Sequence, residues 1–352
     1  MPESVPPRRD RDLAVAVTGP TGEIGRALLR ALEREPSVAR VEAMGRRAFD
    51  PAAAGLAKVR YRRGDVTDRA AVHALVDGAD VVVHLAFAIF DRPEAARAVN
   101  VTGSRNVFEA ALHAGARRLV YTSSIAAYGF HEDTPAVVNE EHPARGSDDH
   151  PYSAQKADVE RMLDNVARGR DADVYVFRPC IVAGPTATML VERIPYVGLQ
   201  RRMPGPLRRA VAAVPALRPV IPDPGVPFQL VHEDDVAHAL VRAITGAGPP
   251  GTYNLAADGE VTLSELAEAL GYYRVRVPSG AVEATATIVS RMPMLPVETR
   301  WIAALRVPLR VDCANARVKL GWAPRYDARA TLAALVAGAR ERGLLPWPGR
   351  AP

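Results

Sequence analysis

The stretch Thr18-Gly19-Pro20-Thr21-Gly22-Glu23-Ile24-Gly25 decides the fold of this chain. It directly follows the apolar run Leu13–Val17, which has no polar face and is typical of a strand buried on both sides. It opens an amphipathic segment, Ile24–Glu33, that predicts a helix. Three glycines at this spacing allow a tight turn, a close backbone approach to a pyrophosphate and close packing of helix on strand. Because a helix N-terminus presents free N–H groups to phosphates, the stretch predicts a dinucleotide site.

Short β-branched runs alternate with amphipathic segments along the first 180 residues. The further expected strands are Arg40–Met44, Val59–Arg62, Asp80–Leu85, Leu119–Ser123 and Val174–Phe177. The further expected helices are Ala70–Val76, Ala95–Ala114 and Ser153–Ala167. This alternation, with strands that are apolar on both faces, predicts an α/β fold with a doubly wound parallel sheet of the Rossmann type.

The pattern changes from Gly184 to Phe228, where Pro, Arg, Met and Leu dominate without clear alternation. The α/β pattern then returns briefly, and Thr262-Leu-Ser-Glu265 has the spacing of a capping box at a helix start. We therefore expect a nucleotide-binding domain over residues 12–183 and 229–257. A smaller, discontinuous, mostly helical substrate domain is expected over residues 184–228 and 258–335. Residues 1–11 and 342–352 are expected to be flexible termini.

The composition is that of an ordinary globular protein, with 352 residues, 48% of them apolar and 24% charged. The longest nearly continuous apolar stretch, Val81–Phe90, is about half of what a membrane span needs, so no membrane partner is expected. The 45 Lys and Arg residues are spread along the chain, which argues against a nucleic-acid-binding face. Two distant cysteines, and histidines without metal spacing, predict neither a disulfide framework nor a metal site and fit the cytoplasm.

The residues after the second strand bear on the choice of cofactor. An acidic residue about 20 positions beyond the glycines would bind the ribose hydroxyls of NAD. That place holds Gly45, followed by Arg46 and Arg47, whose guanidinium groups suit a 2′-phosphate. The pattern favours NADP over NAD. Two alternatives stay open: the arginines are simply solvated, or Glu42 serves as the acid if the strand ends early.

The segment Tyr152-Ser-Ala-Gln-Lys156 places a phenol and an ammonium group on one face of a helix. A phenol with a pKa of about 10 is a poor proton donor or acceptor at neutral pH. A nearby ammonium favours the phenolate, so we expect Lys156 to lower the pKa of Tyr152 toward the range of general acid–base catalysis. The chain has only two other lysines, Lys58 and Lys319, which indicates a specific need for lysine here.

Two further polar residues follow predicted strands, at the sheet edge where open α/β sheets bind ligands. Ser124, within Tyr121-Thr-Ser-Ser124, is expected to hold a substrate carbonyl oxygen by a hydrogen bond, and Ser123 is the competing candidate. Asp65, within Gly64-Asp65-Val66, suits the adenine amino group, with a turn or helix-cap role as the alternative.

These motifs, in this order, resemble the extended short-chain dehydrogenase/reductases of the epimerase/dehydratase branch over roughly residues 12–335. The resemblance extends to His84-Leu85-Ala86, Phe177-Arg178-Pro179 and Val231-His-Glu-Asp-Asp235. It implies a catalytic triad of Ser124, Tyr152 and Lys156, and a homodimer formed through the helices 95–114 and 153–167. The expected cofactor contacts are Gly19, Thr21, Gly22, Glu23, Ile24, Gly25, Arg46, Arg47, Asp65, Val66, Leu85, Ala86, Thr122, Tyr152, Lys156, Pro179 and Val182.

Departures from the family pattern bear on the reaction. Sugar dehydratases of this family carry an acidic pair after the catalytic serine, where this chain has Ile125 and Ala126. Nucleotide-sugar epimerases usually carry an arginine four residues before the histidine of the Val-His segment, where this chain has Phe228. The segment 281–307 is apolar and contains methionines, which suits a hydrophobic substrate or a plain core.

The sequence thus predicts an NAD(P)-dependent oxidoreductase that reversibly reduces a ketone or aldehyde on a fairly apolar small molecule. The first alternative is a redox-neutral epimerase that retains NAD and acts on a nucleotide sugar. The second is a non-catalytic regulator that senses NADP, although such a protein would not need the Tyr152 and Lys156 pair.

Overall fold

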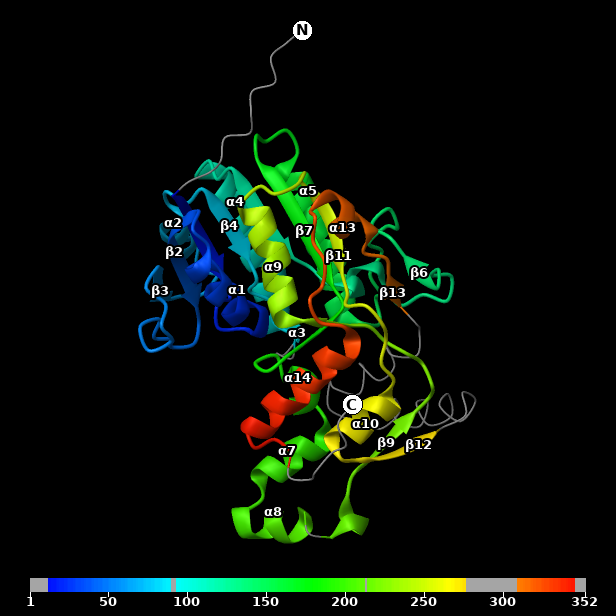
Figure 1. The fold of residues 1–352 in the computed structure, drawn as a ribbon. Coiled ribbons are helices and arrows are strands. Elements are labelled where there is room, and N and C mark those ends of the chain that lie inside the picture. Colours follow the sequence, from blue (N-terminus) through cyan, green and yellow to red (C-terminus); the bar gives the residue numbers. More distant parts are fainter. Residues whose placement is uncertain (1–11, 90–92, 213, 277–308, 346–352) are drawn as a thin grey trace.

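The computed structural model describes residues 12–89, 93–212, 214–276 and 309–345. Its centre is a seven-stranded sheet in the order β3-β2-β1-β4-β5-β7-β11, in which every neighbouring pair is parallel (Figure 1). Its strands are β1 (Leu13–Thr18), β2 (Val38–Gly45), β3 (Val59–Arg63), β4 (Val81–His84), β5 (Arg118–Thr122), β7 (Asp173–Pro179) and β11 (Gly251–Leu255). The Rossmann-type doubly wound sheet predicted from the sequence is confirmed.

Helices cover both faces of the sheet. The helices α1 (Glu23–Arg34) and α9 (Glu233–Ile244) pack together on one face, and α2 (Arg69–Val76), α4 (Ser104–His113) and α5 (Pro151–Ala167) lie on the other (Figure 1). Side chains of one strand alternate between the two layers: Val15 and Val17 belong to the first core, and Ala16 belongs to the second. All six residues of β1 are buried, as expected for a central strand of a parallel sheet.

The helix expected over Ala95–Ala114 is not continuous. The chain forms a short helix α3 (Pro93–Arg97), then a π-helical turn, η1 (Ala98–Gly103), and only then α4. The extra residue of a π turn changes which side chains face inward. Here the turn carries Asn100, which is fully buried and hydrogen-bonded to Ala88 and Gln155.

A smaller second lobe lies at the carboxyl edge of the sheet, below it in Figure 1. It has a separate apolar core, which includes Phe228, Leu266 and Leu332. Its elements are α6 (Met189–Glu192), α7 (Pro195–Arg202), α8 (Gly205–Ala212), η3 (Pro215–Leu217), β9 (Val220–Asp223), α10 (Leu263–Leu270), β12 (Tyr273–Arg276) and α14 (Ala328–Glu341). Thr262 and Glu265 form the predicted capping box of α10.

The boundary between the lobes differs from the expected one. Residues 309–322, expected in the substrate domain, pack on the nucleotide-binding lobe. There β13 (Arg310–Val311) pairs with β6 (Val137–Val138), and α13 (Ala314–Lys319) packs against β11. The reason is the burial of apolar side chains: Trp322 is fully buried, and its indole N–H donates to the Asp235 carbonyl oxygen at 2.9 Å.

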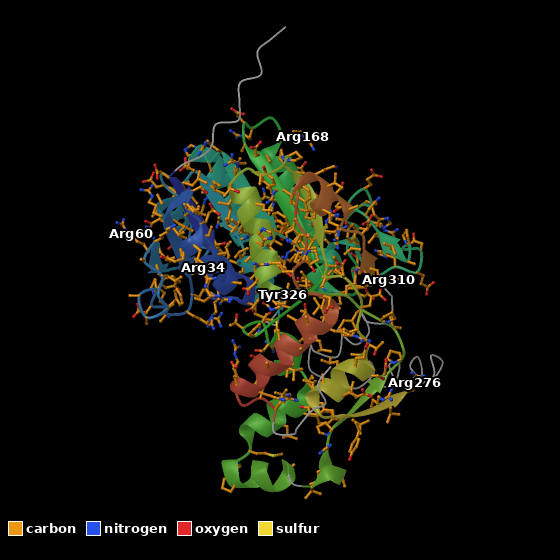
Figure 2. The ribbon with its side chains drawn as sticks, viewed as in Figure 1. Arg34, Arg60, Arg168, Arg276, Arg310 and Tyr326 are labelled. Carbon is orange, nitrogen blue, oxygen red and sulfur yellow. The ribbon has the colours of Figure 1, made fainter. Side chains whose placement is uncertain are left out.

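The flexible end expected from residue 342 does not hold for Leu344 and Leu345, which are buried in the second core. The lobes also meet at a short parallel pair, β8 (Ile181–Ala183) with β10 (Leu230–His232). Next to this pair, Tyr326, labelled in Figure 2, stacks on His232 with ring centres 3.9 Å apart. The labelled arginines Arg34, Arg60, Arg168, Arg276 and Arg310 lie on well-separated parts of both lobes (Figure 2).

Candidate active site

The turn between β1 and α1 leaves no space for side chains at two of its glycines. Gly19 has a φ of +70°, and a Cβ there would lie 2.7 Å from the Ala86 nitrogen. A Cβ on Gly25 would lie 2.4 Å from the Gly19 carbonyl oxygen. Only glycine fits at either position without a shift of the backbone. The third glycine therefore seats α1 directly on the turn, as the motif predicts.

The outer side of this turn is open. A Cβ on Gly22 would meet only the Gly19 carbonyl oxygen within 4 Å, at 3.4 Å. Gly22 is also the N-cap of α1, and no side chain of the described residues caps this helix start. The first N–H groups of α1, among them those of Glu23 and Ile24, thus face an open cradle. Such a cradle at a helix N-terminus fits the pyrophosphate of a dinucleotide.

The Glu23 side chain connects this turn to the second lobe. Its Oε1 accepts the Met189 N–H at 2.7 Å, at the start of α6. Burial raises the pKa of Glu23 to about 7, and the neighbouring carboxylates of Glu192 and Glu233 act in the same direction. The backbone of Glu23 belongs to the open turn before α1, whereas its carboxyl group belongs to the junction between the lobes.

The end of β2 bears on the 2′ position of a cofactor. The strand runs to Gly45, so Glu42 lies inside it, where its carboxylate pairs with Arg62 at 3.2 Å. The condition under which Glu42 would bind the ribose, an early end of the strand, is not met. Arg46 and Arg47 follow the strand and are exposed. Arg47 donates to the Thr21 carbonyl oxygen at 2.7 Å, which holds its guanidinium beside the Gly-rich turn.

Asp65 lies at the expected place after β3, and its Oδ1 accepts the N–H and the hydroxyl of Thr67 at 2.9 and 2.8 Å. This is the turn role that the sequence left open as the alternative. The Val66 side chain is buried against Gly103, where an added Cβ would lie 2.4 Å from its Cγ2. The predicted cofactor contact of Val66 therefore rests on its backbone.

A buried network supports the loop after β4. His84 is fully buried; its Nδ1 lies 2.7 Å from the Thr18 hydroxyl, and its Nε2 lies 2.8 Å from the Ser104 hydroxyl. The Thr18 hydroxyl in turn accepts the N–H groups of Leu85 and Ala86 at 3.3 and 3.4 Å. Burial lowers the pKa of His84 to about 3, so this histidine is a neutral structural group.

Ser124 and Tyr152 are brought together. Ser124 is the N-cap of the short helix η2 (Ile125–Tyr128), where its hydroxyl accepts the Ala126 N–H at 3.2 Å. A side-chain hydrogen bond also joins Ser124 to the Tyr152 phenol. Ser123, the competing candidate, is 2% exposed and lies beside Tyr121 instead. The geometry therefore favours Ser124 as the serine of the site.

Lys156 is buried next to these two residues, with 3% of its surface exposed. Its Nζ donates to the Thr122 carbonyl oxygen at 2.8 Å and to the Tyr121 hydroxyl at 3.3 Å. Nζ is 5.8 Å from the centre of the Tyr152 ring. The helical spacing puts Tyr152 and Lys156 on one face of α5, and there Lys156 contacts Thr122 at the end of β5 while Tyr152 contacts Ser124 just beyond it. The Thr122 hydroxyl is buried there without a hydrogen-bond partner among the described residues.

The charge state of the pair differs from the expectation. Burial raises the pKa of Tyr152 to about 12, and its hydrogen bond with Ser124 lowers it only in part. Burial also lowers the pKa of Lys156 to about 7. The pKa of Tyr152 is therefore raised, not lowered as expected, although Lys156 lies nearby. The reason is desolvation, which penalises the charged form of each group.

The sequence of this chain matches a known family. The model of the NAD dependent epimerase/dehydratase family matches residues 15–256, which include the Gly-rich turn, Ser124, Tyr152 and Lys156. The chain belongs to the NAD-dependent epimerase/dehydratase family.

Two relatives of this epimerase/dehydratase-family protein differ in how much of the chain they match. An uncharacterised protein of Mycobacterium tuberculosis is 28% identical over a match that covers 96% of this chain and 88% of that protein. Human 3 beta-hydroxysteroid dehydrogenase type 7 is 35% identical over 43% of this chain and 44% of its own.

Two solved structures share the fold. A short-chain dehydrogenase/reductase superfamily protein of Agrobacterium tumefaciens with bound NAD has a TM-score of 0.69 and 20% identity, over a match that covers 94% of this chain and 98% of that protein. UDP-glucose 4-epimerase of Thermotoga maritima with UDP-glucose has a TM-score of 0.69 and 20% identity, over a match that covers 94% of this chain and 99% of that protein.

Several residues of the site escaped the sequence reasoning. Phe87 covers the Lys156 ammonium, with Nζ 3.7 Å from the ring centre, and contacts the Tyr152 ring edge-to-face at 5.5 Å. Asn100 holds both the Phe87 loop, through Ala88, and Gln155, the residue before Lys156. A search for buried polar residues inside helix patterns would have singled out Asn100.

The remaining predicted residues lie at the rim between the lobes. Pro179 ends β7, and Val182 lies in β8 opposite Val231 of β10. Phe228, in the place where the family's epimerases usually carry an arginine, is buried in the second core and pairs with Val261. The apolar segment 281–307 lies outside the described residues.

The described residues contain neither a metal-binding cluster nor a membrane-spanning helix. In residues 12–89, 93–212, 214–276 and 309–345, no group of three or more His, Cys, Asp or Glu side chains has the arrangement of a metal site. Within the same residues, no helix combines the length and the apolar character of a membrane span.

Proposed function

We propose that this protein catalyses the reversible, NAD(P)-dependent conversion of a ketone into a secondary alcohol on an apolar small molecule. The observation that carries the proposal is the convergence of Ser124, Tyr152 and Lys156 at the end of β5, beside an open Gly-rich cradle. The bound cofactor supplies hydride for the reduction and accepts it in the reverse direction.

The residues of the chain handle the proton. The raised pKa of Tyr152 keeps its phenol protonated at neutral pH, so a proton is present for the carbonyl oxygen, but its release needs a nearby positive charge. Ser124, already hydrogen-bonded to that phenol, is placed to orient the same oxygen. When Tyr152 gives up its proton, the charged form of Lys156 stabilises the resulting phenolate. Lys156 is also the residue that would bind the hydroxyls of the nicotinamide ribose.

The proposed substrate class is supported by Phe228, which stands where nucleotide-sugar epimerases of this family usually carry an arginine that binds the diphosphate. A buried Phe228 offers no charge to a nucleotide sugar, and its side chain belongs to the core of the second lobe. One relative is a human 3 beta-hydroxysteroid dehydrogenase, identical at 35% of positions over the part that matches. Both observations favour an apolar, hydroxysteroid-like substrate.

The preferred cofactor of the proposal is NADP. Arg46 and Arg47 stand where an acidic residue would select NAD, and Glu42 is committed to Arg62 within the sheet. The related Agrobacterium structure holds NAD, so both cofactors are tested.

The proposal also includes a homodimer. Helices α4 and α5 pack side by side on one outer face of the sheet. A second copy packed on this face would complete a four-helix bundle. Light scattering at micromolar concentration is expected to give twice the mass of the chain, and a monomeric mass would remove the dimer from the proposal.

The first experiment identifies the nucleotide that the purified protein carries, by mass after denaturation. Absence of nucleotide, or a partial load of NADP, indicates an exchanging cofactor and supports the oxidoreductase. Nearly stoichiometric NAD would instead support the alternative, a redox-neutral epimerase.

The second experiment offers NADPH and NADH with apolar cyclic ketones, and separately offers UDP-glucose. Oxidation of NADPH by ketones with no change in UDP-glucose is the expected outcome. Epimerisation of UDP-glucose without net oxidation would overturn the proposed function.

A further inference from the structure

Glu160 and Arg178 form a buried ion pair directly behind the site. The two side chains are each 7% exposed, and Arg178 Nη2 donates to Glu160 Oε2 at 2.5 Å. Arg178 Nε lies 3.1 and 3.2 Å from the two carboxylate oxygens. The guanidinium also rests 4.5 Å from the centre of the Tyr128 ring. The Arg178 fork thus engages both oxygens of the carboxylate.

The groups that contact the Lys156 ammonium, in contrast, are all uncharged. Its hydrogen bonds go to the Thr122 carbonyl oxygen and the Tyr121 hydroxyl, and Phe87 covers it from another side. The titratable side chains around it are Tyr121 on β5, Tyr152 and Glu160 on α5, and His84 on β4. Burial keeps the two tyrosines and His84 neutral near pH 7. Glu160 is therefore the side chain among these four whose negative charge can act on Lys156.

Glu160 stands four residues after Lys156 on the same helix, a spacing at which a carboxylate and an ammonium can pair directly. Among the described residues no hydrogen bond joins the two, and Glu160 acts on the lysine only through space, raising its pKa. A direct contact would do more. It would hold the ammonium in an ion pair, and the carboxylate charge would then cancel part of the electrostatic effect of Lys156 on Tyr152.

We propose that Arg178 is a positioning residue that sequesters the Glu160 carboxylate and so leaves the Lys156 ammonium free to act on the Tyr152 phenol. The inference rests on the proposed function, because it concerns the proton chemistry of the same triad. It assigns the buried pair a role in catalysis besides its role in packing.

The decisive comparison uses Arg178→Met, Glu160→Gln and the double variant. Arg178→Met keeps an apolar stem of similar length but releases the carboxylate, which is then free to pair with Lys156. We expect the single variant Arg178→Met to lose at least about tenfold in kcat for ketone reduction, the effect of one pKa unit on a coupled group. The double variant Arg178→Met/Glu160→Gln has no carboxylate to release, so it is expected to recover most of that loss.

A second readout follows the lysine itself. Only Lys58, Lys156 and Lys319 are lysines, so ¹³C-labelled lysine gives three side-chain NMR signals that can be assigned with Lys→Arg variants. The titration midpoint of Lys156 is expected to rise by about one pH unit or more in Arg178→Met and to fall back in the double variant. Arg178→Lys keeps a cation beside Glu160 and is expected to leave the midpoint near that of the wild type.

Arg325→Met is the matched control. Arg325, itself 60% exposed, pairs at 3.1 Å with the fully buried carboxylate of Asp235 on α9. Its loss is expected to lower thermal stability without moving the Lys156 midpoint. This control separates the effect of removing an arginine partner from a buried carboxylate elsewhere from the effect of releasing Glu160.

The outcomes separate the inference from the proposed function. If the wild type reduces ketones but the double variant is no faster than Arg178→Met and the Lys156 midpoint does not move, Arg178 has only a structural role and the inference is overturned. If Arg178→Met does not fold, Arg178→Gln also removes the cation beside Glu160, and the same rise of the Lys156 midpoint is expected in it; an unmoved midpoint there overturns the inference. If the wild type reduces no ketone, the proposed function fails, while the NMR titrations still report on the sequestered carboxylate.

Discussion

The Lys156 ammonium lies against the face of the Phe87 ring, 3.7 Å from its centre. At this distance the ring quadrupole stabilises the cation, by about 0.5–2 kcal/mol at partly to fully desolvated sites. Phe87 is therefore part of what keeps Lys156 charged, in opposition to the burial that lowers its pKa to about 7.

We expect Phe87→Leu to lower the pKa of Lys156 further. Reduction needs the charged lysine to stabilise the phenolate, so kcat for reduction should fall as pH rises through about 7 in the wild type. In Phe87→Leu this fall should begin at lower pH, because the uncharged lysine is favoured. A pH profile of kcat measures the shift. Phe87→Tyr keeps the aromatic face and serves as the control; an unchanged profile in Phe87→Leu would contradict the role of the ring.

Tyr152→Phe should cut turnover by orders of magnitude, since the variant has no phenolic proton to donate. Fluorescence titration should show nearly unchanged cofactor affinity, because the ring and its contact with Phe87 remain. Turnover at the wild-type rate would remove Tyr152 from the mechanism.

Arg46→Ala/Arg47→Ala should weaken NADPH binding at least about tenfold, through the loss of charge-assisted hydrogen bonds to the 2′-phosphate. Affinity for NADH should change little, because NADH lacks that phosphate. Calorimetric titration with each cofactor gives both values. Arg34→Ala, an exposed arginine at the end of α1, is the control and should affect neither cofactor. Equal losses for NADPH and NADH would argue against a 2′-phosphate site.

Glu23→Gln should stabilise the protein at pH 8 but not at pH 4. The pKa of Glu23 is raised to about 7 in the folded state from 4.5, so the folded state holds a proton between these values that the unfolded chain has lost. The wild type therefore loses stability as pH rises from about 4.5 to 7, and the glutamine variant does not.

Denaturant unfolding across this pH range measures the difference for Glu23. Glu33→Gln is a matched control, because Glu33 lies on the same helix and also accepts a backbone N–H, from Lys58 at 3.0 Å. A pH-independent difference between Glu23→Gln and the wild type would show that Glu23 does not titrate in this range.

The sequence is sufficient to predict the parts of the site that depend on local spacing. The Gly-rich turn, the strand-end Ser124 and the i,i+4 pair of Tyr152 and Lys156 each lie within one short segment. The doubly wound parallel sheet is predicted as well, because strands that are apolar on both faces alternate with helices along the sequence. The helix expected over 95–114 is interrupted because the π turn depends on what Asn100 binds, at Ala88 and Gln155.

The features that escaped prediction depend on distant partners or on burial. Phe87 reaches Lys156 across 69 positions, a contact that no local pattern encodes. The pKa of Tyr152 rises because the fold buries the phenol, and the spacing of Tyr152 and Lys156 in the sequence does not reveal that burial. Trp322 packs with the first lobe because Asp235 accepts its N–H, although its position in the chain lies beyond the second lobe's α10.

Asn100 has a consequence for how this site opens. Its buried side chain accepts the Ala88 N–H at 2.6 Å and donates to both the Ala88 carbonyl oxygen and Gln155, so the loop carrying Phe87 and the helix carrying Lys156 share one clamp. The Ala88 amide hydrogen can exchange with deuterium only when its bond to Asn100 breaks. Its exchange rate therefore measures how often the loop that carries Phe87 leaves the buried asparagine.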